Sequence, residues 1–150
     1  MDHKTLLEDV IVGLYKIGAV KFGDFKLRSG LSSPVYIDLR SIVAYPELLK
    51  NISELVWLKV QSTILPGVDP SHRAYVCGVP YSALTIATSL CVNHSLPSLI
   101  VRKEAKVHGT KKLVEGILED GKKNFVIVVE DVVTSGISIS ETVEKIKGNY

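Results

Sequence analysis

An unbroken apolar run near the end of the chain is followed directly by two carboxylates and a hydroxyl-rich segment. The run, Phe125-Val126-Ile127-Val128-Val129, is rich in β-branched side chains and comes after a polar Gly-Lys-Lys-Asn segment. Such a run is typical of a central strand in a parallel sheet, because that strand is buried on both faces. The chain is therefore expected to fold as an α/β domain.

The segment after this strand carries the groups that a phosphorylated sugar needs. Glu130 and Asp131 end the strand, and a Thr-Ser-Gly segment follows at 134–136. Ser138 and Glu141 have the spacing of a capping box, which predicts the start of a helix. Backbone N–H groups at such a start bind phosphate, and carboxylates accept hydrogen bonds from sugar hydroxyls. The alternative is that the acidic pair only ends a strand and the serine only caps a helix.

The composition fits one globular domain. Of the 150 residues, 46% are hydrophobic and 23% are charged, which excludes a disordered or fibrous chain. A net charge of +2 gives no reason to expect nucleic-acid binding. The chain has no apolar stretch of the ~20 residues that cross a membrane and no hydrophobic targeting region at its start. Cys77 and Cys91 lie in apolar segments, so we expect buried thiols in a cytoplasmic protein.

Hydrophobic periodicity predicts the other elements. An amphipathic helix is expected from Thr5 to about Gly18, and a second helix begins at Pro46. Alternating residues at 20–30 and 35–39 predict a strand pair that covers part of the sheet. Buried strands are expected at 74–77 and 99–101, with a helix at 83–92. Cys91 and His94 are three residues apart, but a zinc site needs three or four ligands, so we expect both to be ordinary packing residues.

A basic segment follows the strand at 99–101. Five lysines and arginines occur between Arg102 and Lys112, without apolar periodicity. A solvated run of charges is the usual explanation of such a segment. However, it leaves the same edge of the sheet as the acidic pair, where cations would face an anionic ligand.

Three of these segments resemble the type I phosphoribosyltransferases, and specifically the orotate phosphoribosyltransferases. Residues 128–138 resemble the signature for phosphoribosyl pyrophosphate (PRPP), 25–38 resemble the N-terminal motif of the orotate enzymes, and 102–109 resemble their catalytic loop. The intervening sequence is similar to the N-terminal domain of eukaryotic UMP synthase, where a decarboxylase domain is fused. The resemblance implies a parallel sheet flanked by helices, with a small hood at about 1–45 and a PRPP-binding core at about 46–150.

The resemblance also implies an activity and a set of site residues. Orotate and PRPP would give orotidine 5′-monophosphate and pyrophosphate, a step of pyrimidine biosynthesis, with Mg²⁺ held through PRPP and not by direct protein ligands. A homodimer that exchanges its basic loop between subunits is implied as well. The implied catalytic residues are Lys103, Lys106, His108 and Asp131. Orotate would contact Tyr36, Ile37 and Thr134. The residues that would contact PRPP are Arg28, Tyr81, Ser82, Arg102, Lys103, Lys106, His108, Glu130, Asp131, Val132, Val133, Thr134, Ser135, Gly136, Ile137 and Ser138.

The chain departs from the family pattern in three places. Arg28 replaces the usual lysine, and Ser82 stands where bacterial relatives have a lysine. The helix that opens at Ser138 is the last predicted element, whereas the orotate enzymes continue with a strand and an arginine that holds the orotate carboxylate. We therefore expect an incomplete domain that lacks its last strand and leaves uncovered both the apolar side of the helix at 139–146 and the edge of the strand at 125–129. Such a chain is expected to self-associate and to have little activity toward orotate. A non-catalytic PRPP- or nucleotide-binding protein of the same fold is the alternative.

Overall fold

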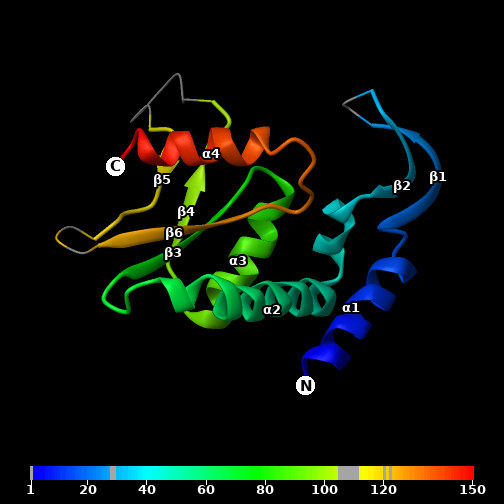
Figure 1. The fold of residues 1–150 in the computed structure, drawn as a ribbon, viewed down its shortest axis with the longest axis horizontal. Helices are drawn as coiled ribbons and strands as arrows, with labels where there is room; N and C mark the ends of the chain where they lie inside the picture. The colour runs from blue at the N-terminus through cyan, green and yellow to red at the C-terminus, as the bar shows by residue number, and fades with distance from the viewer. Residues whose placement is uncertain (1, 28–29, 105–111, 120, 122) are drawn as a thin grey trace.

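The computed structural model of the chain describes residues 2–27, 30–104, 112–119, 121 and 123–150. Its central element is a four-stranded sheet in the order β5-β4-β3-β6, shown in Figure 1. β3 (Arg73–Gly78) runs parallel to both β4 (Ser98–Val101) and β6 (Asn124–Val129), whereas β5 (Val114–Glu115) is antiparallel to β4. The sheet is therefore mixed, with three parallel strands.

The apolar strand at 124–129 lies at an edge of this sheet. It pairs with β3 from Arg73 opposite Asn124 to Gly78 opposite Val129, and it has no second strand beside it among the described residues. The expectation of a central strand was therefore wrong, and β3 has the central place, whereas the expected uncovered edge of this strand is confirmed for the described residues. β5 was not predicted, because two residues are too few to show a periodicity.

Helices cover both faces of the sheet. α2 (Pro46–Thr63) and α3 (Ser82–His94) lie on one face, and α4 (Ile137–Lys147) lies on the other (Figure 1). Side chains alternate along β3, so Val76 is buried with α2 and α3, whereas Tyr75 and Cys77 are buried in a second cluster with Ile146 of α4. Ile139 packs against the first cluster. The expectation that the helix at 139–146 would be uncovered was therefore wrong.

The N-terminal elements form a separate layer beside α2, which we call the hood. α1 (His3–Lys16) precedes an antiparallel pair of strands, β1 (Val20–Lys26) and β2 (Ser32–Ile37), and a 3₁₀ segment at Leu39–Ala44 leads into α2. The predicted amphipathic helix and strand pair are confirmed. The pair forms a two-stranded sheet of its own, and the expectation that it covers part of the main sheet stays a prediction. Gly18, with φ +67°, ends the first helix as expected.

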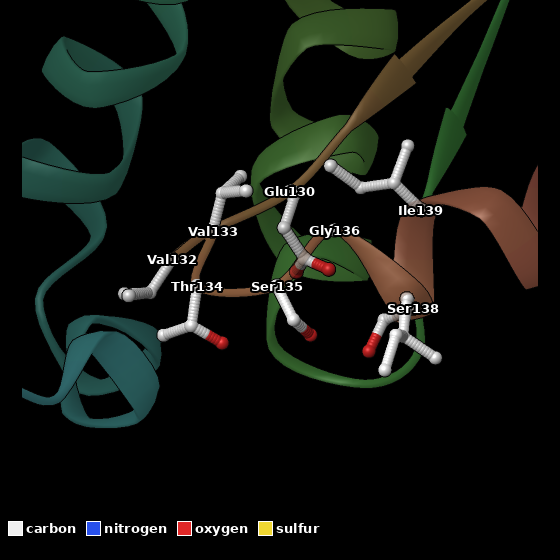
Figure 2. Close-up of a pocket in the computed structure, with 9 residues that line it drawn as sticks. Glu130, Val132, Val133, Thr134, Ser135, Gly136, Ser138 and Ile139 are labelled. Atoms are coloured by element: carbon white, nitrogen blue, oxygen red, sulfur yellow. The ribbon is translucent and has the colours of Figure 1, made fainter. Parts of the chain in front are cut away.

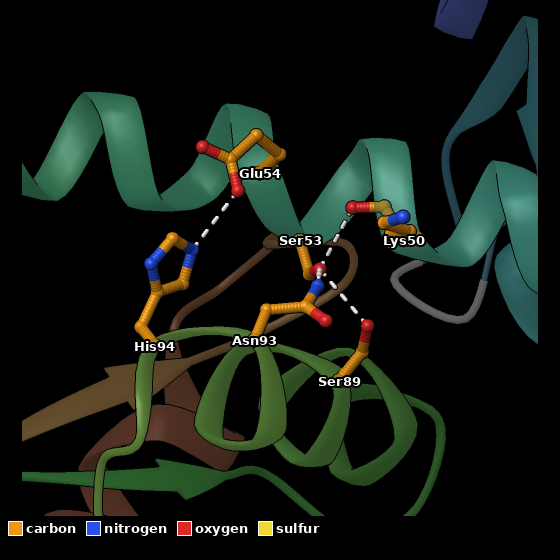
Figure 3. Close-up of polar contacts among 6 residues, drawn as sticks. All are labelled: Lys50, Ser53, Glu54, Ser89, Asn93 and His94. Atoms are coloured by element: carbon orange, nitrogen blue, oxygen red, sulfur yellow. Dashed lines mark hydrogen bonds and ion pairs between the residues drawn. The ribbon is translucent and has the colours of Figure 1, made fainter.

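Polar side chains join α2 to α3, as Figure 3 shows. Ser53 is fully buried, and its hydroxyl lies 2.9 Å from the Ser89 hydroxyl and 3.2 Å from Nδ2 of Asn93. At the next position of each helix, Nε2 of His94 lies 2.9 Å from a carboxylate oxygen of Glu54. His94 thus contacts α2, and the described residues contain no cluster of three or more potential metal ligands.

Both cysteines are buried free thiols, as predicted. Burial raises the pKa of the Cys77 thiol to about 11 and also raises that of Cys91. Among the helices that the structure describes, none combines the length and the apolar character needed to cross a membrane.

Candidate active site

Three loops meet at the carboxyl ends of the parallel strands. They follow β3 at 78–82, β4 at 102–104 and β6 at 130–136. The N–H of Val79 donates to the carbonyl of Val129 at 2.9 Å, so the first and third loops start side by side. Ligand sites of α/β sheets occur at this edge, because loops from neighbouring strands diverge there.

The acidic pair occupies the end of β6. Glu130 and Asp131 are both half-buried, and Oε1 of Glu130 accepts a hydrogen bond from the Asp131 N–H at 3.1 Å. Partial burial, together with a side-chain hydrogen bond and like charge from Asp131, raises the pKa of Glu130 to about 7. The strand thus ends in two neighbouring carboxyl groups, which offer several hydrogen-bonding oxygens to a polyhydroxylated ligand.

The loop after the acidic pair forms a shallow polar cup of about 30 Å³ over the start of α4. In Figure 2 the side chains of Thr134, Ser135 and Ser138 point to one side of the loop, whereas those of Val133 and Ile139 point to the other. The cup is lined by Glu130, Val132, Val133, Thr134, Ser135, Gly136, Ile137, Ser138 and Ile139. This arrangement brings the residues predicted for phosphate binding together on one loop.

The predicted capping box is absent. α4 starts at Ile137, its N-cap is Gly136 in a left-handed conformation with φ +77°, and no side chain caps it. Ser138 is therefore inside the first turn, where its N–H has no partner within the helix. A helix start without a side-chain cap leaves its N–H groups free for an anion, and the helix dipole favours negative charge there.

The loop after β3 presents an exposed aromatic ring next to a cation. Tyr81 is 67% exposed, and Nζ of Lys103, from the loop after β4, lies 4.3 Å from the centre of its ring. Gly78 permits the sharp turn into α3, because a Cβ there would lie 2.5 Å from the carbonyl oxygen of Ala83. Ser82 is the first residue of α3 and is half-buried.

Arg102, predicted to contact pyrophosphate, lies beside Glu115 of β5. Its Nε and Nη2 lie 3.0 and 2.8 Å from the same carboxylate oxygen. Any anionic ligand would therefore have to share the guanidinium with Glu115, and the predicted contact stays a prediction.

The hood supplies the two residues predicted to contact orotate. Tyr36 is half-buried with its ring centre 5.4 Å from that of Phe25, whereas Ile37 is exposed. Arg40, which sequence reasoning did not single out, follows this strand in the 3₁₀ segment at Leu39–Ala44. Its pKa is raised mainly by a bidentate ion pair with Asp38, with smaller contributions from Tyr36 and Asp131. The one sequence signal for this contact is the Asp-Leu-Arg order at 38–40, because an aspartate side chain often bonds the backbone two residues later in an Asx-type turn.

Comparison with known proteins identifies the family. No model of a known protein family matches the chain. Uridine 5′-monophosphate synthase of Bos taurus is 45% identical over 140 residues, which are 93% of this chain and 28% of that protein. Orotate phosphoribosyltransferase of Chlamydia caviae is 34% identical over 97% of this chain and 67% of that protein. The chain belongs to the orotate phosphoribosyltransferase family.

A solved structure agrees with this assignment. The crystal structure of orotate phosphoribosyltransferase from Aeropyrum pernix has a TM-score of 0.70 and 31% identity, and the match covers 93% of this chain and 74% of that one. The type I phosphoribosyltransferase fold expected from the sequence is thereby confirmed. The chain spans 28% of the length of the bovine synthase and 67% of the chlamydial enzyme.

Three residues predicted for the site of this orotate phosphoribosyltransferase domain lie outside the described residues. They are Arg28 of the hood and two residues of the basic segment, Lys106 and His108. Their roles stay predictions. The described part of the candidate site consists of the acidic pair, the polar cup, the Gly78–Ser82 loop and Lys103.

Proposed function

We propose that this domain binds PRPP and transfers its phosphoribosyl group to orotate, giving orotidine 5′-monophosphate and pyrophosphate. One observation carries the proposal: the loop after β6 holds both an acidic pair and a helix start without a side-chain cap, and the loop after β4 brings Lys103 to the same edge of the sheet. PRPP has a phosphate, two ring hydroxyls and a pyrophosphate, which match these three groups in kind. The names of the relatives support orotate as the second substrate.

Each loop has a separate task in this proposal. The 5′-phosphate binds at the cup of Thr134, Ser135 and the α4 start, where N–H groups and hydroxyls donate to it. The ribose hydroxyls donate to the carboxylates of Glu130 and Asp131. The pyrophosphate lies toward Lys103, whose ammonium balances the charge that builds up as the C1′–O bond breaks.

Catalysis then consists mostly of positioning and electrostatics. The nitrogen of orotate forms a bond to C1′ as the pyrophosphate oxygen leaves with the bonding electron pair, so positive charge develops on the ribose and negative charge on the leaving group. The acidic pair beside the ribose stabilises the first charge. Lys103, and by resemblance Lys106, His108 and Arg28, stabilises the second.

Mg²⁺ fits this site as a companion of the ligand. The described residues contain no group of three or more potential ligands, which is compatible with a metal ion that enters the site together with PRPP. The carboxylates of Glu130 and Asp131 could contribute to a metal ion that is otherwise held by phosphate oxygens. Bound in that way, Mg²⁺ would act as a Lewis acid that neutralises the leaving pyrophosphate.

We further propose a cytoplasmic homodimer. The cytoplasm is supported by the two free cysteines. A dimer is supported by an apolar row on α1, in which Leu7, Ile11 and Tyr15 are 41%, 58% and 68% exposed. Light scattering after size-exclusion chromatography measures the mass in solution and tests the dimer.

A pyrophosphate-release assay with Mg²⁺ and PRPP tests the activity. Orotate, adenine and hypoxanthine are supplied separately to the chain. Because the sequence predicts little activity for this chain, we expect a low level of release, and with orotate alone. PRPP binding without release for any base would instead favour the non-catalytic binding protein. Absence of PRPP binding would contradict both functions.

The acidic pair provides a control on the site. Asp131→Asn should weaken PRPP binding or turnover by about 10-fold or more, with little loss of folding stability, because a half-buried carboxylate at a strand end has little to pack against. If the variant loses stability while its folded fraction keeps full affinity, the assignment of Asp131 to the ribose is wrong.

A further inference from the structure

Lys145 joins the last helix to the segment that follows β4. Its Nζ donates to the carbonyl of Lys103 at 2.8 Å and to the carbonyl of Arg102 at 3.2 Å. Both carbonyls come after Val101, which forms the last pair of β4 with β5. A half-buried ammonium that donates to two consecutive carbonyls fixes the direction in which the chain leaves the sheet.

The same segment is held from its other side. The N–H of Arg102 donates to the carbonyl of Leu113 at 2.8 Å, and its guanidinium pairs with Glu115. Residue 102 is thus tied to the β5 segment, whereas residue 103 is tied to α4. Of these contacts, the one from Lys145 is the contact that reaches the main chain of Lys103.

The Lys103 side chain points from this segment into the candidate active site. Its ammonium lies over the Tyr81 ring, and both Lys103 and Lys145 line a pocket of about 320 Å³. Val79 and Pro80 of the loop after β3 and Glu141 of α4 line the same pocket. Holding a lysine side chain in one conformation costs about 2 kcal/mol of rotamer entropy. A fixed main chain at Lys103 limits the positions that its ammonium can reach, so it helps to determine where the charge lies in the pocket.

We propose that Lys145 is a positioning residue for Lys103: by holding the carbonyls of Arg102 and Lys103, it places the Lys103 ammonium where it meets a pyrophosphate group. The inference rests on the proposed function in giving Lys103 an anionic ligand. α4 then serves the site at both ends, since its first turn forms the polar cup and its last turn holds the Lys103 segment.

The test measures binding of Mg²⁺-pyrophosphate to the full chain by titration calorimetry. Lys145→Met keeps the aliphatic stem but removes the donor, and it should weaken binding about tenfold. Lys145→Arg keeps a charged donor and should recover most of the affinity. Lys147→Met is the matched control, because Lys147 lies in the same turn but pairs with Glu144 on the surface, and it should bind as the parent chain does.

A double-mutant cycle with Lys103→Met separates positioning from general stability. If Lys145 acts through Lys103, Lys145→Met should change binding by less than about twofold once Lys103 is already replaced. Additive losses would overturn the proposal, as would unchanged binding in Lys145→Met or a parent chain that does not bind pyrophosphate. Urea midpoints check folding, and if Lys145→Met does not fold, Lys145→Gln replaces it in the cycle.

The outcomes also separate this proposal from the proposed function. A parent chain that binds pyrophosphate but releases none from PRPP and orotate contradicts the proposed function, while the cycle in binding still decides the role of Lys145. Turnover of orotate together with additive binding losses contradicts the role of Lys145 alone.

Discussion

At the scale of single residues, two glycines at the site, Gly78 and Gly136, stand where a larger residue would be unfavourable. Gly136 has a positive φ, which lets the chain turn from the acidic pair into α4 without a side-chain cap. Gly78 lacks room for a Cβ, because the backbone of Ala83 and Leu84 lies within 2.7 Å of its position. The loops that would hold phosphate and pyrophosphate therefore depend on glycine for different reasons.

Gly78→Ala should destabilise the fold and displace the loop after β3. Since backbone atoms cannot move aside as a flexible side chain can, we expect a loss of about 1–3 kcal/mol in the free energy of unfolding, measured by urea denaturation. Gly67→Ala is the control, because nothing lies within 4 Å of the Cβ it would add. Equal effects of the two substitutions would contradict this account of Gly78.

The raised pKa of Glu130 predicts a pH dependence of stability. Its pKa is about 7 in the folded chain, against the ordinary glutamate value of 4.5, so the folded state holds a proton that the unfolded chain releases. This contribution to stability is complete below about pH 4.5 and is lost as the pH rises through about 7. The urea midpoint of the parent chain relative to Glu130→Gln should therefore fall across this range. If the difference in urea midpoint between the two chains stays constant with pH, the pKa of Glu130 is not raised in the folded chain.

At the scale of elements, α2 and α3 are held together by polar as well as apolar contacts. Ser53 is fully buried and lies within hydrogen-bond distance of Ser89 and Asn93, and its hydroxyl also donates to the Lys50 carbonyl (Figure 3). The His94 ring stacks on Trp57, with ring centres 4.7 Å apart. Buried polar groups of this kind need partners in one register, so they favour a single packing of the two helices.

Ser53→Ala should therefore be more harmful than its small change in volume suggests. It removes the fully buried hydroxyl that lies within hydrogen-bond distance of half-buried Ser89 and exposed Asn93, so we expect a loss of about 1–2 kcal/mol in the free energy of unfolding. Ser62→Ala, on the same helix, removes an exposed hydroxyl that bonds only the Lys59 carbonyl three residues earlier, and it should change stability by less than about 0.5 kcal/mol. Thermal unfolding of both variants gives the comparison.

The elements also show which features a sequence can reveal. The hood, β3, β4, β6 and the main helices could be predicted because their periodicity is local, and the acidic pair and phosphate loop because they are contiguous. The start of α4 was misplaced, since the Ser138 and Glu141 pattern competes with a glycine that adopts a positive φ. Arg102 with Glu115 and Lys145 with Lys103 could not be predicted, because packing joins them across 13 and 42 residues.

At the scale of the whole molecule, one sheet supports two hydrophobic clusters. The cluster with α2 and α3 contains Val76, Ile127 and Cys91, and the cluster with α4 contains Tyr75, Cys77 and Ile146. Because adjacent residues of β3 face opposite clusters, neither cluster can separate without breaking the central strand. The site lies at the edge where both clusters end, so its loops depend on the integrity of both.

This arrangement predicts that the two cysteines become reactive together. Cys77 and Cys91 lie in different clusters, and burial raises the pKa of both thiols, so neither should react with a thiol reagent in the folded chain near neutral pH. As urea is increased, both should become labelled at the same midpoint as the loss of helical circular dichroism, because shared use of β3 makes unfolding cooperative. Mass spectrometry of peptides after labelling measures each thiol separately. Cys77→Ala and Cys91→Ala confirm which thiol each signal reports. Labelling of one cysteine well below the midpoint of the other would show that the two faces of the sheet unfold independently.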